Sequence, residues 1–312
     1  MKSHSLSLIS APLDLGAENL GVDIGPDAFR HAGIITKLEG TGLEVADEGS
    51  IEVADRQSID RGNPRLHYLD EIVRVNEVIA GKTHDAIKAG RAAVVIGGDH
   101  SVNLGAVAGA SVALEGDIGV IYFDAHGDMN TDETTVTGNI HGMHLASLMG
   151  FGAKELVNVY GEGAKLPKEN LLHVGGSDFD QPELDLILGE HLNAYTLFDV
   201  LTKGLGELID RINELSERVP NIWISLDLDS IDRIYAPGAG MPNAKGLTYR
   251  EIATLAEYIG THCNIVGIDV VEYNPLQDEQ SKTAELGIEL IAKFLGRNYS
   301  WYTNYLGHNQ IG

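Results

Sequence analysis

Short β-branched and apolar runs alternate along this chain with longer segments of helical periodicity. The predicted strands are 6–9, 92–96, 118–123, 171–174, 222–226 and 265–270. Strands that alternate with helical segments are typical of parallel sheets with helices on both faces. The pattern therefore predicts an α/β three-layer sandwich around a mainly parallel sheet.

Two helices have clear signals in the pattern. Residues 67–89 repeat apolar positions as a helix covering a sheet would, and their predicted buried stripe consists of Leu69, Ile72, Val73 and Ile79. Thr248 and Glu251 form a capping box that predicts the start of a second helix. Gly260 is the expected stop of that helix.

The chain offers no place at which to divide it. It has 312 residues, of which 43% are hydrophobic, and that is enough for one large core. Internal repeats, low-complexity tracts and Pro/Ser-rich linkers are all absent from the sequence. We therefore expect a single domain over residues 1–312.

The charge balance is strongly acidic. The 22 Lys and Arg residues against 46 Asp and Glu residues give a formal net charge of −24. Such a chain repels phosphate backbones and anionic membranes, so neither nucleic acid nor a membrane surface is expected as a partner. The excess acid fits plain solubility, and it also fits attraction of a cationic substrate and metal ions.

Cysteine content and hydropathy indicate a cytoplasmic protein. Cys263 is the single cysteine, so the chain has no intramolecular disulfide, and its apolar surroundings indicate a packed side chain rather than a nucleophile. The N-terminal residues lack a signal-peptide cleavage pattern. No apolar stretch approaches the ~20 residues of a membrane span.

Candidate chemistry gathers where three predicted strands end. The strand 92–96 leads into Gly97-Gly98-Asp99-His100-Ser101, where the paired glycines are expected to form a tight turn that leaves His100 at the carboxyl edge of the sheet. A histidine in a glycine-rich loop is more often solvated than a ligand, so this motif alone indicates little.

The second segment, 124–128, follows the strand 118–123. In extended backbone the i, i+2 and i+4 positions share a face, which would bring Asp124, His126 and Asp128 together. A polar turn in which the aspartates cap backbone amides is the alternative.

The third segment repeats the arrangement, with Asp227 and Asp229 at the end of the strand 222–226. Adjacent buried carboxylates repel each other and lose hydration, and a cation removes both costs. Two histidines and four aspartates exceed what one four-coordinate zinc needs, and they suit two oxygen-preferring ions. The sequence therefore predicts a binuclear metal site.

These motifs resemble the signature blocks of the arginase/agmatinase ureohydrolases, in the order found in that family. The blocks are GGDHS at 97, DAHGDMN at 124, TGNIHGM at 137, SLDLDSID at 225 and APGAGMP at 236. The segments GVDIGP at 21 and VEYNP at 271 are similar to those of arginases in particular. The resemblance implies the arginase-like fold with about eight strands.

The resemblance also implies two Mn²⁺ ions per subunit, with Co²⁺ or Ni²⁺ as alternatives. One ion would be held by His100, Asp124, Asp128 and Asp227, and the other by Asp124, His126, Asp227 and Asp229. Asp124 and Asp227 would bridge them. Such a pair lowers the pKa of a shared water, and the resulting metal-bridging hydroxide would attack the substrate.

The catalytic roles follow from the same resemblance. Glu272 would pair with the guanidinium group of the substrate, and His141 would shuttle a proton to the leaving amine. Asp128 counts both as a metal ligand and as a catalytic residue. Taken without the family, His141 would be interpreted as a solvated loop residue and Glu272 as a surface glutamate.

The resemblance further implies how the substrate is bound. The α-carboxylate and α-amine would be held by Asn130, Thr137, Asn139, Asp180 and Glu183. These residues favour hydrolysis of L-arginine to L-ornithine and urea. Agmatinase, guanidinobutyrase or another guanidino-compound hydrolase is the alternative, and a catalytically silent structural homologue is a further one.

Three residues depart from the family pattern. His144 stands where proline is usual, Thr137 where serine is common, and Arg233 where proline follows Asp232. We expect Thr137 to narrow the pocket slightly and Arg233 to leave its loop less rigid. The resemblance also implies a homo-trimer or homo-hexamer, and the aromatic tail 299–302 is expected to pack on the body or on a neighbouring subunit.

Overall fold

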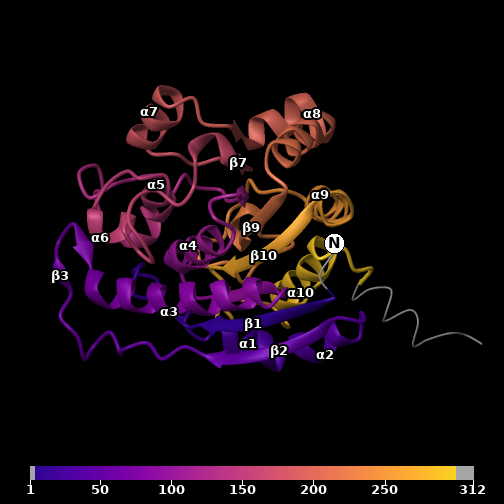
Figure 1. Ribbon diagram of the computed structural model, residues 1–312, viewed down its shortest axis with the longest axis horizontal. Helices are drawn as coiled ribbons and strands as arrows, with labels where there is room; N and C mark the ends of the chain where they lie inside the picture. Colours follow the sequence, from indigo (N-terminus) through magenta and orange to yellow (C-terminus); the bar gives the residue numbers. More distant parts are fainter. Residues whose placement is uncertain (1–3, 300–312) are drawn as a thin grey trace, which may run out of the picture.

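A sheet of eight parallel strands forms the centre of the computed structural model, which describes residues 4–299 (Figure 1). The strand order is β2-β1-β5-β10-β9-β6-β7-β8. The strands are β1 (Ser5–Ala11), β2 (Glu44–Ser50), β5 (Ala92–Gly97), β6 (Gly119–Phe123), β7 (Leu171–Val174), β8 (Ala194–Tyr195), β9 (Asn221–Asp227) and β10 (Asn264–Val271). A separate antiparallel hairpin joins β3 (Gly62–Asn63) to β4 (Leu66–His67). The prediction of an α/β fold with a sheet of about eight strands is confirmed.

All six strands predicted from the sequence are present, and the two that were missed form the edges of the sheet. Strand β2 is largely solvent-accessible, and β8 has only two residues. Edge strands need not bury both faces, so they lack the apolar run that identified the inner strands.

Within the described residues, ten α-helices cover the two faces of the sheet, as their arrangement in Figure 1 shows. One face carries α1 (Gly25–His31), α2 (Ile34–Glu39), α8 (Leu197–Arg218), α9 (Tyr249–His262) and α10 (Lys282–Phe294). The other carries α3 (Leu69–Lys88), α4 (Asn103–Ala113), α5 (His144–Leu148), α6 (Lys154–Val157) and α7 (Gln181–Gly189). These helices and the sheet make the three layers that the sequence predicts.

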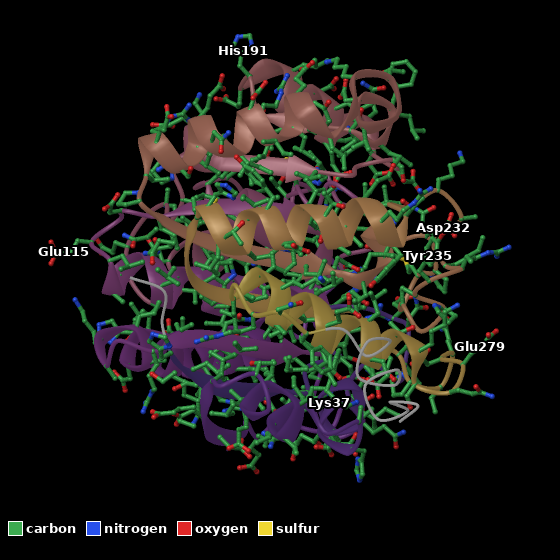
Figure 2. All side chains as sticks on the ribbon, turned by 90° about the vertical axis from the view of Figure 1, so that its right-hand side faces the viewer. Lys37, Glu115, His191, Asp232, Tyr235 and Glu279 are labelled. Atoms are coloured by element: carbon green, nitrogen blue, oxygen red, sulfur yellow. The ribbon has the colours of Figure 1, made fainter. Side chains whose placement is uncertain are left out.

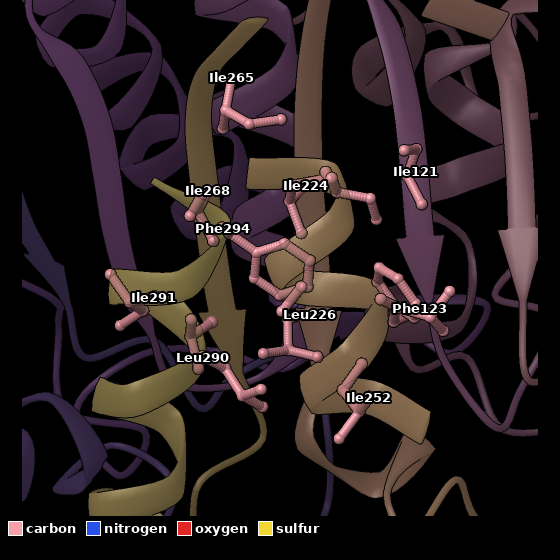
Figure 3. Packing of buried hydrophobic residues seen from close by; sticks show 14 of the residues in the cluster. Ile121, Phe123, Ile224, Leu226, Ile252, Ile265, Ile268, Leu290, Ile291 and Phe294 are labelled. Atoms are coloured by element: carbon pink, nitrogen blue, oxygen red, sulfur yellow. The ribbon is translucent and has the colours of Figure 1, made fainter. Parts of the chain in front are cut away.

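The core divides into two layers because successive strand residues point to opposite faces. In β6, Ile121 and Phe123 pack under α9 and α10, whereas Val120 and Tyr122 point toward α3 and α4. Figure 3 shows the first layer, where Phe294 of α10 lies over the strands. The ring centroids of Phe123 and Phe294 are 5.7 Å apart.

Both helix predictions hold, with two corrections. Helix α3 buries Ile72 and Ile79 as predicted, but Val75 is fully buried, whereas Leu69 and Val73 are only half-buried. The capping box of Thr248 and Glu251 starts α9 as predicted, with Thr248 accepting from the Glu251 amide.

The prediction that Gly260 stops helix α9 is wrong, because the helix continues to His262. A Cβ atom at position 260 would lie 1.9 Å from the carbonyl oxygen of Lys293 in α10. Gly260 therefore serves the close packing of two helices and not a left-handed cap. Cys263, just beyond, is buried as predicted.

Glycines also allow α3 and α4 to approach closely. A Cβ atom on Gly109 of α4 would lie 2.2 Å from the carbonyl oxygen of Ala80 in α3. This contact sets the distance between α3 and α4. Helix α4 begins at Asn103, shortly after His100.

The carboxyl ends of all eight strands lie at one edge of the sheet, because the strands are parallel. Asp232 and Glu279, in the loops that follow β9 and β10, lie on the same side of the molecule in Figure 2. All three candidate segments therefore emerge at this edge.

Two further predictions concern the surface and the tail. None of the helices within residues 4–299 is long and apolar enough to cross a membrane. Tyr299 is buried against the core, in agreement with the predicted packing of the aromatic tail, and residues 300–302 lie outside the described part of the chain.

Candidate active site

The ends of β5, β6 and β9 bring four predicted metal ligands together in a first cluster. Nδ1 of His100 lies 2.9 Å from Asp124 Oδ2, 3.2 Å from Asp128 Oδ2 and 3.2 Å from Asp227 Oδ2. All four side chains are buried. Within this cluster, His100 with Asp124 and Asp227 could hold a divalent cation, and so could His100 with Asp128 and the neighbouring His144.

A second cluster adjoins the first through Asp124. Nδ1 of His126 lies 3.0 Å from Asp229 Oδ2 and 3.5 Å from Asp124 Oδ1. Asp124 thus offers one oxygen to each cluster, which fits its predicted role as a bridging ligand. Asp227 belongs to the first cluster, and its predicted role as the second bridging ligand stays a prediction.

Backbone hydrogen bonds fix two of the aspartates. Asp124 Oδ1 accepts from the His126 amide at 2.7 Å, and Asp227 Oδ1 accepts from the Asp229 amide at 2.7 Å. These bonds are the Asx turns of the alternative interpretation, and they coexist with the clusters, because a carboxylate oxygen that accepts one hydrogen bond keeps another lone pair.

Two expectations about the backbone at the site are wrong: the extended conformation of residues 124–128 and the reason for the paired glycines, Gly97 and Gly98. Asp128 has a φ of 53°, so it joins the first cluster through a left-handed residue and not by extended alternation. Neither Gly97 nor Gly98 has a positive φ. Gly98 is required instead because a Cβ atom there would lie 2.0 Å from the Leu13 carbonyl oxygen.

The electrostatics of the clusters fit divalent cations. Burial, with repulsion from Asp229 and Asp124, raises the pKa of Asp227 well above its usual range. Burial and repulsion from Asp124 raise the pKa of Asp229 to about 6. Asp124 Oδ2 and Asp229 Oδ2 are buried yet accept no hydrogen bond of ordinary geometry, although an imidazole nitrogen lies within 3.0 Å of each. Lone pairs that converge on one point in this way are the arrangement that a metal ion occupies.

An outer layer of hydrogen bonds orients His100. Its Nε2 lies 2.9 Å from Ser225 Oγ, which in turn donates to Asp269 Oδ2 at 2.7 Å. Asp269 also accepts from Asn103 Nδ2 at 2.8 Å and from Trp223 Nε1. Buried partners of this kind fix the ring of a metal-ligating histidine. Sequence reasoning missed this layer, although the polar Ser225 and Asp269 inside two apolar strands were a signal for it.

The two predicted catalytic residues outside the clusters lie next to each other. His141 Nδ1 is 3.4 Å from Glu272 Oε1, and the same oxygen accepts from the His100 amide at 3.0 Å. Glu272 has a φ of 59° and is buried, which contradicts its interpretation as a surface glutamate. Burial lowers the pKa of His141, but its hydrogen bond to Glu272 outweighs this effect and raises the pKa to about 9. His141 therefore carries a proton at neutral pH.

A cavity of about 190 Å³ opens beside the second cluster, and the predicted substrate-binding residues line it. Its wall includes Asn130, Thr137, Asn139, Asp180, Glu183, His126, Asp128 and His141. The structure therefore brings the predicted site residues to one place, in the cavity wall or in the adjoining clusters, with Glu272 behind them in contact with His141 and the His100 amide.

Hydrogen bonds within the cavity wall already engage three of these residues. Asn130 Nδ2 donates to Asp180 Oδ2 at 3.0 Å. Glu183 accepts from the Met129 amide at 3.0 Å and from the Asp180 amide at 2.8 Å, completing the capping box of α7. Burial raises the pKa of Glu183 to about 7. Glu183 thus holds two segments of the cavity wall together.

The three departures from the family pattern have different surroundings. His144 is fully buried beside the first cluster, where burial and the charge on His100 lower its pKa to about 3. Thr137 lines the cavity. The exposed Arg233 donates its amide hydrogen to the Asn243 carbonyl at 2.9 Å, a bond that proline could not make and that offsets the loss of a fixed φ.

A parallel α/β sheet with two linked His/Asp clusters at its carboxyl edge, and a polar cavity beside them, defines the class of binuclear metal-dependent enzymes. The comparisons narrow this class. The family model described as the arginase family matches residues 4–296. The arginases of Brevibacillus brevis and Bacillus caldovelox are each 37% identical to this chain, over 94% and 93% of it and 98% of each relative.

The solved structures agree. The arginase structure from Bacillus caldovelox superimposes with a TM-score of 0.91 at 36% identity, over 96% of this chain and 100% of that one. The chain belongs to the arginase family, and it is an enzyme of the ureohydrolase class.

Proposed function

We propose that this enzyme hydrolyses L-arginine to L-ornithine and urea. The observation that carries the proposal is the placement of a polar cavity against the two His/Asp clusters, with Glu272 and His141 beside them. The arginase names of relatives that match nearly the whole chain support the same substrate.

We propose two Mn²⁺ ions as the cofactor, with Co²⁺ and Ni²⁺ as ions that the same ligands would accept. One would be held by His100, Asp124, Asp128 and Asp227, and the other by Asp124, His126, Asp227 and Asp229. When bound, such a pair supplies a water of lowered pKa and a positive field at the reacting carbon. The orphaned oxygens of Asp124 and Asp229 support this assignment.

The protein's own residues would bind and protonate the substrate. The buried carboxylate of Glu272 can accept charge-assisted hydrogen bonds from the guanidinium group. Once water has added to the guanidino carbon, the bond from this carbon to Nε of arginine breaks, and that nitrogen must gain a proton to leave as the δ-amine of ornithine. His141 can deliver that proton, since its raised pKa keeps it protonated at neutral pH.

The far end of the cavity would select an amino acid. Thr137 and Asn139 offer hydroxyl and amide donors to an α-carboxylate, and Asp180 offers an acceptor to an α-ammonium group. Asn130 and Glu183 hold this wall in shape through the bonds described above. The site therefore matches both charged groups that distinguish arginine from agmatine.

A urea-release screen tests the proposal. Metal-free protein would be loaded separately with Mn²⁺, Co²⁺ and Ni²⁺ and assayed with arginine, agmatine, guanidinobutyrate and guanidine. We expect urea and ornithine from arginine with metal, and none without it. Faster turnover of agmatine or guanidinobutyrate would favour those hydrolase activities, and no turnover of any compound would favour a silent homologue.

We also propose a homo-trimer or homo-hexamer in the cytoplasm. The resemblance to the family suggests the assembly, and exposed apolar side chains on α7 and α8 are available for subunit contacts. They are Leu188, Phe198 and Leu201, each more than 70% exposed. Light scattering after size-exclusion chromatography would give the number of subunits, and a monomer would refute this proposal.

A further inference from the structure

A buried tyrosine and histidine adjoin the first cluster and have no role in the mechanism above. The hydroxyl oxygen of Tyr122 lies 2.9 Å from Asp128 Oδ2, 3.0 Å from His100 Nδ1 and 3.1 Å from His144 Nε2. Tyr122 and His144 are both fully buried. The Tyr122 hydroxyl group thus contacts two ligands of the first cluster, His100 and Asp128, and also the imidazole of His144 in α5.

The two residues also enclose the ring of His100. The rings of His100 and Tyr122 are stacked, with centroids 4.9 Å apart and an interplanar angle of 3°. The centroid of the His144 ring lies 4.5 Å from that of His100. Ser225 fixes the opposite nitrogen of His100. Ring stacking and the contact with Ser225 together hold the His100 imidazole, and its Nδ1 points into the first cluster.

The hydrogen bonds of His144 define which of its nitrogens faces Tyr122 as an acceptor. His144 Nδ1 lies 2.6 Å from the His141 carbonyl oxygen, which can only accept, so Nδ1 carries the hydrogen. In the neutral ring, Nε2 then presents its lone pair to the Tyr122 hydroxyl. His144 thus serves as an acceptor for that hydroxyl, anchored to the backbone of the cavity loop.

The number of hydrogens available to these groups determines which hydrogen bonds form when a cation is bound. The Tyr122 hydroxyl has one hydrogen, and its three neighbours, His100 Nδ1, Asp128 Oδ2 and His144 Nε2, each offer a lone pair once His100 Nδ1 is deprotonated, as metal binding requires. A cation that takes the lone pairs of His100 and Asp128 leaves His144 as the acceptor for that hydrogen. The hydroxyl oxygen then faces the cation with its negative end. With a cation in the first cluster, the Tyr122 hydroxyl and His144 Nε2 are therefore both satisfied.

We propose that Tyr122 and His144 act as one positioning unit that strengthens the metal site of His100 and Asp128, without affecting the site of His126 and Asp229. This inference rests on the binuclear metal site of the proposed function. It also gives a role to His144, the departure from proline that the family resemblance left unexplained.

The test measures metal affinity and not only activity. Metal-free wild-type protein, Tyr122→Phe, His144→Leu and the double variant would be titrated with Mn²⁺, with bound ions counted by elemental analysis after equilibrium dialysis. Losing such a partner typically weakens metal binding by ~10–100-fold. We expect a loss of this size for one of the two ions in each single variant. The double variant should be no weaker than the weaker single variant, because the two residues act through one hydrogen bond.

Background variants identify which ion is weakened. With His126→Asn, only the first cluster keeps its ligand set, so adding Tyr122→Phe should weaken the remaining ion. With His100→Asn, the same addition should change nothing. Activity of Tyr122→Phe should return at saturating Mn²⁺, while the concentration for half-activation rises by the same factor as the dissociation constant.

Tyr195→Phe is the matched control, since it removes another buried hydroxyl, one that donates to the Gly204 carbonyl beyond β8. A similar loss of metal in this control, or unchanged affinity for both ions in Tyr122→Phe, would overturn the inference. Additive losses in the double variant would also overturn it. Should His144→Leu fail to fold, His144→Pro replaces it, because the first position of α5 tolerates proline. Failure of the wild type to bind two ions would instead refute the proposed cofactor.

Discussion

Replacing Asn139 with alanine should reduce the preference of the enzyme for arginine over agmatine. Asn139 lines the cavity, where its amide Nδ2 can donate to an α-carboxylate, and its Oδ1 lies 3.3 Å from His67 Nδ1. Thr137 Oγ1 accepts from the Asn139 amide, so its own hydroxyl hydrogen is available in the same way. Asn130 already donates to Asp180. Thr137 and Asn139 are therefore the donors that an α-carboxylate would complete.

The size of the effect follows from one hydrogen bond to a charged group, which is worth ~1.5–3 kcal/mol. Since about 1.4 kcal/mol corresponds to tenfold, Asn139→Ala should lower kcat/KM for arginine by ~10–150-fold. Agmatine has no carboxylate to lose, so its kcat/KM should change by less than about threefold. The unmodified enzyme should prefer arginine by at least about 100-fold, because agmatine leaves both donors unpaired.

Initial rates of urea release with both substrates, for wild type and variant at saturating metal, give all four values. Thr137→Ser keeps the hydroxyl and serves as the control, with a small change for both substrates. Equal losses for arginine and agmatine in Asn139→Ala would refute the reasoning, and so would comparable wild-type rates on the two substrates.

Four further outcomes are expected. Asp227→Ala should lose both metal and activity, which elemental analysis and urea release would show; two retained ions with near-normal turnover would remove Asp227 from the ligands. His141→Asn should keep two metals while turnover falls by about 10-fold or more, and metal loss would make His141 a ligand. Neighbouring carboxylates raise the pKa of both histidine ligands above their usual range despite burial. The metal-free protein therefore holds protons that metal ions must displace. Calorimetry in two buffers should show this proton release, and the affinity for Mn²⁺ should rise with pH through neutrality. Gly109→Ala should lower the free energy of unfolding by ~1–3 kcal/mol, because the new methyl group overlaps a carbonyl oxygen of α3, whereas Gly81→Ala in open space on α3 should not destabilise; urea denaturation compares the two.

The sequence predicted the inner sheet well because its strands are buried on both faces. Strands β5, β6, β9 and β10 are nearly continuous apolar runs, and such runs end abruptly where the polar site begins. Strand β2 mixes charges with glycine, and its place is set by pairing with β1. Nothing in its own residues indicates a strand, because a register with a distant partner is not a local property.

The sequence predicted those site residues that are of a metal-ligating type and stand next to the end of a strand. The positions of Asp124 and Asp227 follow from that rule, but the left-handed backbone of Asp128 does not. Tyr122 was counted as one more residue of an apolar strand, and His144 only as a departure from proline. Their contact with His100 depends on how α5 packs against β6, and this packing involves residues far apart in the chain.

The position of β10 in the sheet determines when during biosynthesis the first cluster can form. Strand β10 lies between β5 and β9, which do not pair with each other. His100 follows β5 on one half of the sheet, and the five aspartate and histidine ligands of 124–229 follow β6 and β9 on the other half. A ribosome must therefore have synthesised the chain through Val271, and that strand must have emerged from the exit tunnel, before the two halves join. Assembly of the first cluster is for this reason a late event in the synthesis of each molecule, and in a chain arrested before β10 His100 would lie apart from Asp124, Asp128 and Asp227.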